Sequence, residues 1–165
     1  MFRQIADFEG AWAYERESTL KILRGLTEAS LAQPVAPGRR TLGRLAWHVV
    51  TSVSEMARHA GLAATGPDDK APQPSLAEMI RTYEESAGGL GELVRARWSD
   101  AMLSELIPIY GEQWTRGQTL GALIAHQTHH RGQMTVLMRQ AGLAVPGIYG
   151  PAKEEWAAMG MDPQE

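Results

Sequence analysis

Residues 41–60, TLGRLAWHVVTSVSEMARHA, carry the hydrophobic pattern that decides the fold. Apolar side chains recur there at steps of three and four residues, as they do on the buried face of an amphipathic α-helix. They are Leu42, Leu45, Ala46, Val49, Val53, Met56, Ala57 and Ala60. Thr41 can accept a hydrogen bond from an early backbone N–H, and Gly61 can end the helix. The pattern therefore predicts a helix from about Thr41 to Ala60.

Three further segments show the same periodicity, from about Phe2 to Leu26, from Ser75 to Trp98 and from Gln118 to Ala141. The first is the least regular, because residues 15–19 are mostly polar. Four long amphipathic helices without a strong alternating strand pattern are typical of a four-helix bundle. We predict an all-α, antiparallel four-helix bundle.

Shorter elements are expected between and after these helices. Ser99 and Asp100 can cap a short helical turn at residues 101–106, and residues 108–117 indicate an irregular or hairpin connection before the last long helix. Pro151 is well placed as the first residue of a small helix that ends near Met159. A chain of 165 residues and 18.1 kDa is of a usual size for one core, so we predict a single domain over residues 1–165.

Composition excludes several classes of function. The 16 basic and 19 acidic residues give a net charge of −3, and the basic residues are scattered, so no nucleic-acid partner is expected. The chain has no cysteine, which leaves only nitrogen and oxygen ligands for a metal. No apolar run is long enough for a membrane span and the N-terminus lacks the pattern of a secretory signal, so we expect a cytoplasmic protein that does not bind a membrane.

Three of the five histidines lie close together in the fourth helical segment, at positions 126, 129 and 130. His126 and His130 are four residues apart, which places both rings on one face of a helix, roughly 6 Å apart at Cβ. Two rings so placed can bind one metal ion, as in zinc proteases. A zinc protease is nevertheless disfavoured, because Gln127 stands where that motif needs a catalytic glutamate.

The remaining histidines have different expected positions. His48 lies at the edge of its apolar stripe and could face a neighbouring helix. His59 lies roughly 16 Å further along the same helix, too far to share an ion with His48, and is expected to pair with Glu55. His129 should point towards solvent. A hydrogen-bonded structural role for the core-facing histidines is the alternative to metal binding.

Four segments of the sequence together resemble the DinB-like (YfiT-like) family of metalloenzymes. They are residues 45–48 (LAWH), 110–114 (YGEQW), 126–133 (HQTHHRGQ) and 146–151 (PGIYGP). The resemblance implies a four-helix bundle, usually a homodimer, with a divalent metal held by His48, His126 and His130. Some members of the family are S-transferases or isomerases that depend on a low-molecular-weight thiol, whose thiolate binds the metal.

These observations and the resemblance predict a divalent-metal-dependent enzyme that acts on a small-molecule substrate. Imidazole ligands favour Zn or Ni. The first hypothesis is a small-thiol-dependent S-transferase or isomerase, and the second is hydrolysis by metal-activated water. A non-catalytic dimeric bundle that binds a metal or ligand is the third.

Several residues near the histidines have candidate roles. Gln133 could orient a ligand or the bound water, although a helix-capping or interface role is an equal alternative. Arg131 could pair with an anion, or bridge helices or subunits. Tyr110, Trp114 and Tyr149 could line a pocket above the metal, but aromatic residues at loop ends more often cover the core.

Overall fold

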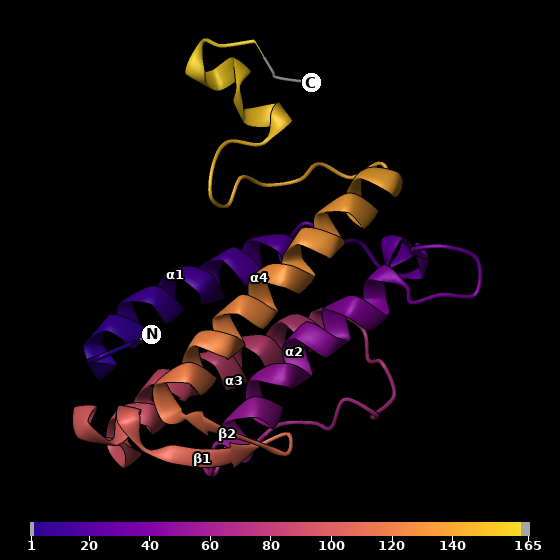
Figure 1. The fold of residues 1–165 in the computed structure, drawn as a ribbon. Coiled ribbons are helices and arrows are strands. Elements are labelled where there is room, and N and C mark those ends of the chain that lie inside the picture. The colour runs from indigo at the N-terminus through magenta and orange to yellow at the C-terminus, as the bar shows by residue number, and fades with distance from the viewer. Residues whose placement is uncertain (1, 163–165) are drawn as a thin grey trace.

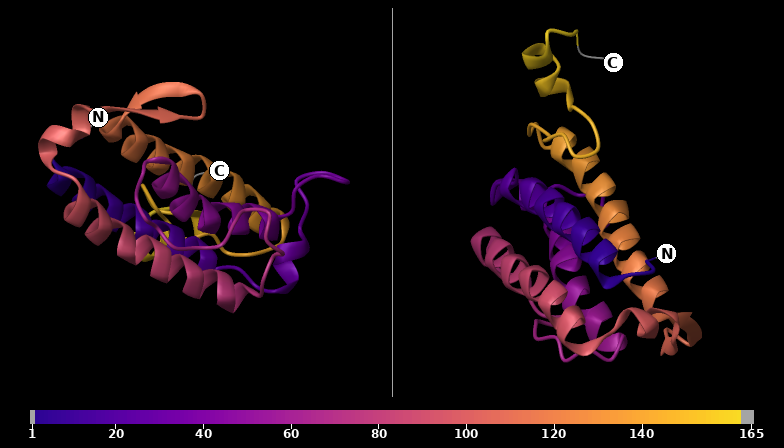
Figure 2. Two further views of the ribbon diagram at one scale, coloured as in Figure 1. Left: turned by 90° about the horizontal axis from the view of Figure 1, so that it is seen from below. Right: turned by 90° about the vertical axis from the view of Figure 1, so that its left-hand side faces the viewer.

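The computed structural model describes residues 2–162, and four long helices dominate it (Figure 1). Their bounds are Ile5–Arg24 for α1, Leu42–His59 for α2, Leu76–Arg97 for α3 and Arg116–Gln140 for α4. α1 and α2 each pack against both α3 and α4, so α1 and α2 are diagonal partners in the bundle (Figure 2). The predicted all-α four-helix bundle is confirmed.

Local hydrogen bonds explain where the helices begin. Thr41, Ser75 and Thr115 are the N-caps of α2, α3 and α4, and each side-chain oxygen accepts a hydrogen bond from the backbone N–H three residues later. Such caps satisfy amide groups that have no partner inside the helix. α1 is capped from a distance, since the backbone N–H of Ile5 donates to the carboxylate of Asp100 at 2.8 Å.

The directions of the helices differ from the antiparallel arrangement predicted. Asp100, just after α3, caps the start of α1, and Arg116 at the start of α4 donates to the backbone oxygen of Ala60, just after α2. α2 and α3 therefore end at the same end of the bundle, where α1 and α4 begin (Figure 1). Because the neighbours α2 and α3 are parallel, residues 60–75 must carry the chain back along the length of the bundle.

This return segment, residues 60–75, lies closely against α2. A side chain at Gly66 would place its Cβ 2.4 Å from the hydroxyl oxygen of Ser54, and the backbone there has φ +156°, so glycine is needed on both counts. Further along, the backbone oxygen of Ala71 accepts a hydrogen bond from the indole N–H of Trp47 at 3.1 Å. The segment therefore runs antiparallel to α2 and in contact with it.

A β-hairpin connects α3 to α4. The sequence predicted either an irregular or a hairpin connection here, and the structure has the hairpin. It follows a 3-10 helix at Asp100–Ser104 and consists of β1, Leu106–Ile109, and β2, Glu112–Thr115, which pair in antiparallel register. Tyr110 and Gly111 form the turn with φ of 51° and 85°. Two residues with positive φ are what a tight hairpin turn requires.

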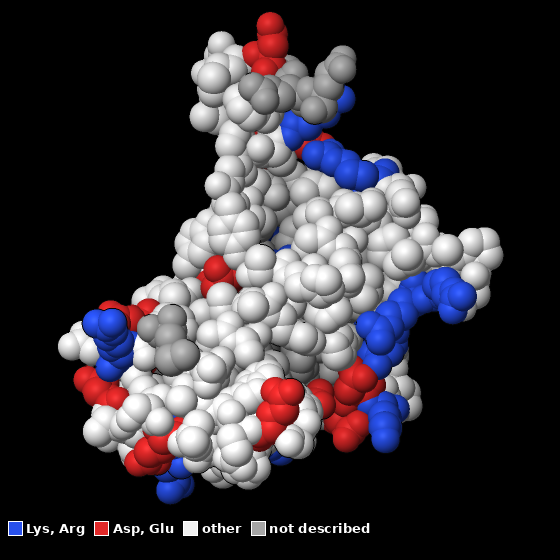
Figure 3. All heavy atoms as spheres, viewed as in Figure 1, with Lys and Arg blue, Asp and Glu red and all other residues white. Residues whose placement is uncertain are grey.

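The segment after α4 contains two 3-10 helices, Lys153–Glu155 and Ala157–Met159, where the sequence predicted one small helix. These elements lie beyond the end of α4, away from the hairpin (Figures 1 and 2). Among residues 2–162, no helix is long and apolar enough to cross a membrane. On the face seen in Figure 3, a band of basic side chains lies over the loop before α2 and the start of that helix.

A polar network crosses the interior between α1 and α4. Arg131 forms an ion pair with Glu15, and their side chains are only 3% and 9% exposed. Arg131 also donates to the hydroxyl of Thr19 at 2.9 Å, while the buried Gln127 accepts hydrogen bonds from Thr19 and Tyr83. Three residues of the polar run that makes the first helix irregular in sequence, Glu15, Ser18 and Thr19, thus face inward, whereas Arg16 and Glu17 pair with each other at the surface. Arg131 bridges α1 and α4, which is one of the roles predicted for it.

We expect substitution of either member of the Arg131–Glu15 pair to destabilise the protein strongly. Arg131→Leu and Glu15→Leu should each lower the free energy of unfolding by about 3–5 kcal/mol, because each leaves one buried charge without a partner. The double variant leaves neither charge, so its loss should be smaller than the sum. Urea denaturation of the four proteins measures this, and additive losses would show that the two charges do not interact.

Candidate metal centre

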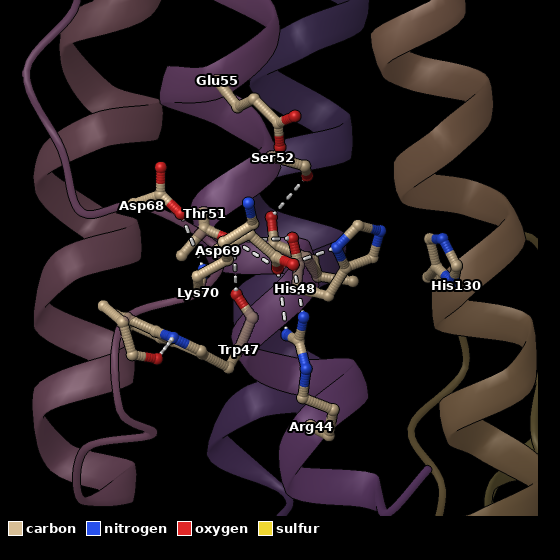
Figure 4. Close-up of polar contacts among 12 residues, drawn as sticks. Arg44, Trp47, His48, Thr51, Ser52, Glu55, Asp68, Asp69, Lys70 and His130 are labelled. Carbon is tan, nitrogen blue, oxygen red and sulfur yellow. Dashed lines mark hydrogen bonds and ion pairs between the residues drawn. The ribbon is translucent and has the colours of Figure 1, made fainter. Parts of the chain in front are cut away.

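His48 of α2 and His126 and His130 of α4 converge on one point. One ring nitrogen from each lies within 4.8 Å of the other two. The Nε2 atoms of His48 and His126 are 3.1 Å apart. A tetrahedral zinc ion with Zn–N bonds of about 2.0–2.1 Å holds its ligand nitrogens about 3.3 Å apart, so this spacing suits one ion. His48 thus faces the neighbouring helix, opposite His130 (Figure 4).

Asp69, from the return segment, holds the ring of His48. Its carboxylate lies 3.0 Å from Nδ1 of His48 and also accepts a hydrogen bond from the hydroxyl of Thr51 (Figure 4). The ion pair with Arg44, together with the hydrogen bonds from His48 and Thr51, holds the pKa of Asp69 well below its usual range. Because an ionised carboxylate can only accept, Nδ1 of His48 carries a proton, and Nε2 is the nitrogen that faces the centre.

Gln133 holds the ring of His130, as Asp69 holds the ring of His48. Its carboxamide oxygen lies 2.8 Å from Nδ1 of His130, and its amide nitrogen lies 3.0 Å from the ring of His129. The oxygen can only accept, so Nδ1 of His130 carries a proton, and in the neutral ring Nε2 is then the free nitrogen. Gln133 therefore contacts the histidine from the outside, and its predicted role towards a ligand or bound water stays a prediction.

The electrostatics of the site favour the neutral forms of His126 and His130. Burial, with the neighbouring charges of His130 and His48, lowers the pKa of His126 to about 4. Burial is also the main cause that lowers the pKa of His130, and the positive charge of Arg40 acts in the same direction. Nδ1 of His126 is buried and has no hydrogen-bond partner among the described residues. Neutral imidazoles with two outer nitrogens already bonded fit a divalent cation, which requires unprotonated nitrogens.

The other two histidines lie where the sequence predicted them. His59 is partly exposed, with Nε2 3.9 Å from the carboxylate of Glu55 and its ring 4.9 Å from that of Tyr110. His129 is exposed. Neither belongs to the group of three that converges between α2 and α4.

The predicted aromatic pocket is not formed as expected. The hydroxyl of Tyr149 bonds to Glu15 and Arg131, on the side of α4 that faces α1. Tyr110 is exposed and packs against Trp114 and His59. Tyr149 therefore follows the alternative that the sequence favoured, a cover over the interior, and its contacts anchor the chain after α4 to the buried ion pair.

Sequence reasoning missed Asp69. It is 21 residues from His48 and lies in a segment without helical periodicity, next to a second acid, Asp68. A pair of acids in a loop is common on protein surfaces and gives no sign of which one contacts a histidine. Only the path of the return segment along α2 identifies it.

Comparisons with known proteins agree with this architecture. The sequence model of the DinB family matches residues 1–165. The chain is 43% identical over 163 residues to the uncharacterized protein YrdA of Bacillus subtilis (strain 168), covering 98% of each chain. The crystal structure of a DinB-like protein from Bacillus cereus ATCC 10987 is 43% identical with a TM-score of 0.86, covering 90% of this chain and 100% of that one.

A more distant structural relative shares the fold. YfiT from Bacillus subtilis, described as a probable metal-dependent hydrolase with an unusual four-helix bundle topology, has a TM-score of 0.63 at 18% identity. The similarity covers 83% of this chain and 89% of YfiT. At that identity the comparison shows a common fold.

The lowered histidine pKa values predict a pH dependence of the metal-free protein. Unfolded histidines bind protons below their ordinary pKa of 6.5, whereas folded His126 binds one only near pH 4. The unfolded state therefore holds more protons in this window, and the free energy of unfolding should fall as pH drops from about 6.5 to about 4. Urea denaturation across this window, with His126→Ala as the control, should show a smaller loss in the variant. An NMR titration that places the pKa of His126 at or above 6.5 would contradict the predicted pH dependence.

Proposed function

The chain belongs to the DinB family, and on that basis we propose that it is a divalent-metal-dependent hydrolase whose ion is held by His48, His126 and His130. The observation that carries the proposal is the convergence of three ring nitrogens within 4.8 Å. The fold shared with YfiT, described as a probable metal-dependent hydrolase, supports the same type of reaction.

Three histidine ligands leave a further coordination position open. A divalent ion in such a site lowers the pKa of a bound water towards 7 and polarises an oxygen of the substrate. The residues of the chain supply the positioning: Asp69 fixes the ring of His48 and Gln133 that of His130, so two of the three rings keep the same proton position with and without the ion. Imidazole ligands make Zn or Ni the first candidates.

Hydrolysis ranks above the thiol-dependent S-transferase or isomerase that the sequence first favoured. The comparison with YfiT points to hydrolysis. The two reactions differ in one requirement, because only the transferase needs an added thiol. The homodimer, the cytoplasmic location and the small-molecule substrate stay predictions from the sequence.

Alanine substitution of each proposed ligand tests the assignment. His48→Ala, His126→Ala and His130→Ala should each lose most of the bound metal, whereas His59→Ala and His129→Ala should retain about one ion per chain. The measurement is elemental mass spectrometry on tag-free protein purified without chelator. Equal loss in all five variants would refute the ligand set, and no metal even after incubation with Zn or Ni would favour a non-catalytic bundle.

Hydrolytic activity is tested on the same preparations with carboxylic and phosphoric esters of 4-nitrophenol. Turnover should be lost with chelator, restored by Zn or Ni and unaffected by added thiol. Activity that appears only with a thiol would instead support the transferase.

Asp69→Asn should weaken metal binding by about 10–100-fold, because the ring of His48 loses the charged group that fixes its proton and orientation. Asp68→Asn is a matched control that removes the same charge one residue away, from an exposed side chain. Competition with a chromogenic chelator gives both affinities. Equal effects of the two substitutions would show that net charge matters, and not the contact with His48.

A further inference from the structure

An open cavity of about 560 Å³ lies beside the metal centre, between the loop before α2 and the second half of α4. Gln133 forms part of its wall and is the residue whose side-chain oxygen lies 2.8 Å from His130. Through this one side chain the cavity borders the outer, Nδ1 edge of His130. It is large enough for a small organic molecule.

One wall of this cavity is cationic. Arg39 and Arg40 line it, and both are exposed. Neither forms an ion pair with any residue in the described range 2–162, in contrast to Arg44, which is paired with Asp69.

The lining of this cavity also has an apolar part. Val136 of α4 and Val35 of the loop before α2 line the cavity and are 57% and 53% exposed, and the buried Leu45 and Leu137 also contribute to its lining. No acidic residue lines this cavity. The second cavity near the histidines is different, because Glu55, Asp68 and Asp69 share its lining with Arg58 and Lys70. Of these two cavities, the first combines unpaired positive charge with exposed apolar surface.

We propose that the substrate is a small anion with an apolar part: its carboxylate or phosphate binds Arg39 and Arg40, its apolar part lies on Val136 and Val35, and its reacting group points past Gln133 to the three histidines. Guanidinium groups bind both oxyanions through charged hydrogen bonds, so the two anions share this recognition. The assignment of this molecule as substrate rests on the proposed hydrolase function. The anion site itself rests only on the cavity.

Binding of matched six-carbon probes to metal-free protein tests the site, since no ion is then present to bind the anion. Hexanoate and hexyl phosphate should bind, and neutral 1-hexanol should bind at least tenfold more weakly, as measured by isothermal titration calorimetry. Arg39→Gln combined with Arg40→Gln should weaken anion binding by about 10–100-fold, as expected for loss of charged hydrogen bonds. Binding should also weaken with added salt.

Arg81→Gln is the matched control, because Arg81 is an exposed arginine on α3 that pairs with Glu78. It should bind both anions as the wild type does. Val136→Asp should weaken binding of both, because it places a negative charge in the apolar wall. Preference for hexanoate or for hexyl phosphate identifies which oxyanion the site selects, and either supports the proposal.

Two results would overturn the proposal: equal binding of hexanol and the anions by the wild type, or unchanged anion binding in the double arginine variant. Failure of the proposed hydrolase is distinguished by His130→Ala, which should lose the metal and keep anion binding. Anion binding in a protein that takes up no metal would refute the hydrolase and leave the anion site standing.

Discussion

The parallel direction of α2 and α3 is the constraint on which the metal centre depends. Neighbouring parallel helices cannot be joined by a tight turn, so residues 60–75 return along α2. That path places Asp69 beside His48 and Thr51, and the ion pair with Arg44 then holds the carboxylate in its ionised form. A carboxylate behind a ligand histidine fixes both its orientation and its proton. The segment that connects α2 to α3 thus completes a site that lies between α2 and α4.

α4 contributes to both the centre and the interior through adjacent residues. His126 and His130 face α2, whereas Gln127 and Arg131, one position further along, face the interior and α1. Successive helical residues are about 100° apart, so the two sets occupy different faces of one helix. The Arg131–Glu15 pair and the hydrogen bonds of Gln127 resist rotation of α4. They therefore position the histidines without touching them, which is how a site becomes preorganised.

Charge is distributed asymmetrically around the centre. Asp69 contacts the outer nitrogen of His48, so its negative charge would stabilise the positive charge that a bound ion places on that ring. Arg39 and Arg40 lie on the other side, next to Gln133 and an exposed apolar wall. A cation held by neutral histidines and flanked by these arginines would attract anions in a chain whose net charge is −3. In the proposed site, the local placement of charge, and not its total, would select the ligand.

The sequence by itself determined the helices and most of the centre. Spacing, caps and glycines gave the four helical segments to within a few residues, because these signals are local. Four-residue spacing brought His126 and His130 to one face, and resemblance to a family added His48, which the fold then placed opposite them. Tertiary structure alone decided the direction of α3, the contact of Asp69 with His48 and the inward orientation of Glu15. The physical reason is that a loop has no periodicity to show where it passes, and a polar side chain faces inward only when a partner from a distant segment, here Arg131, compensates its burial.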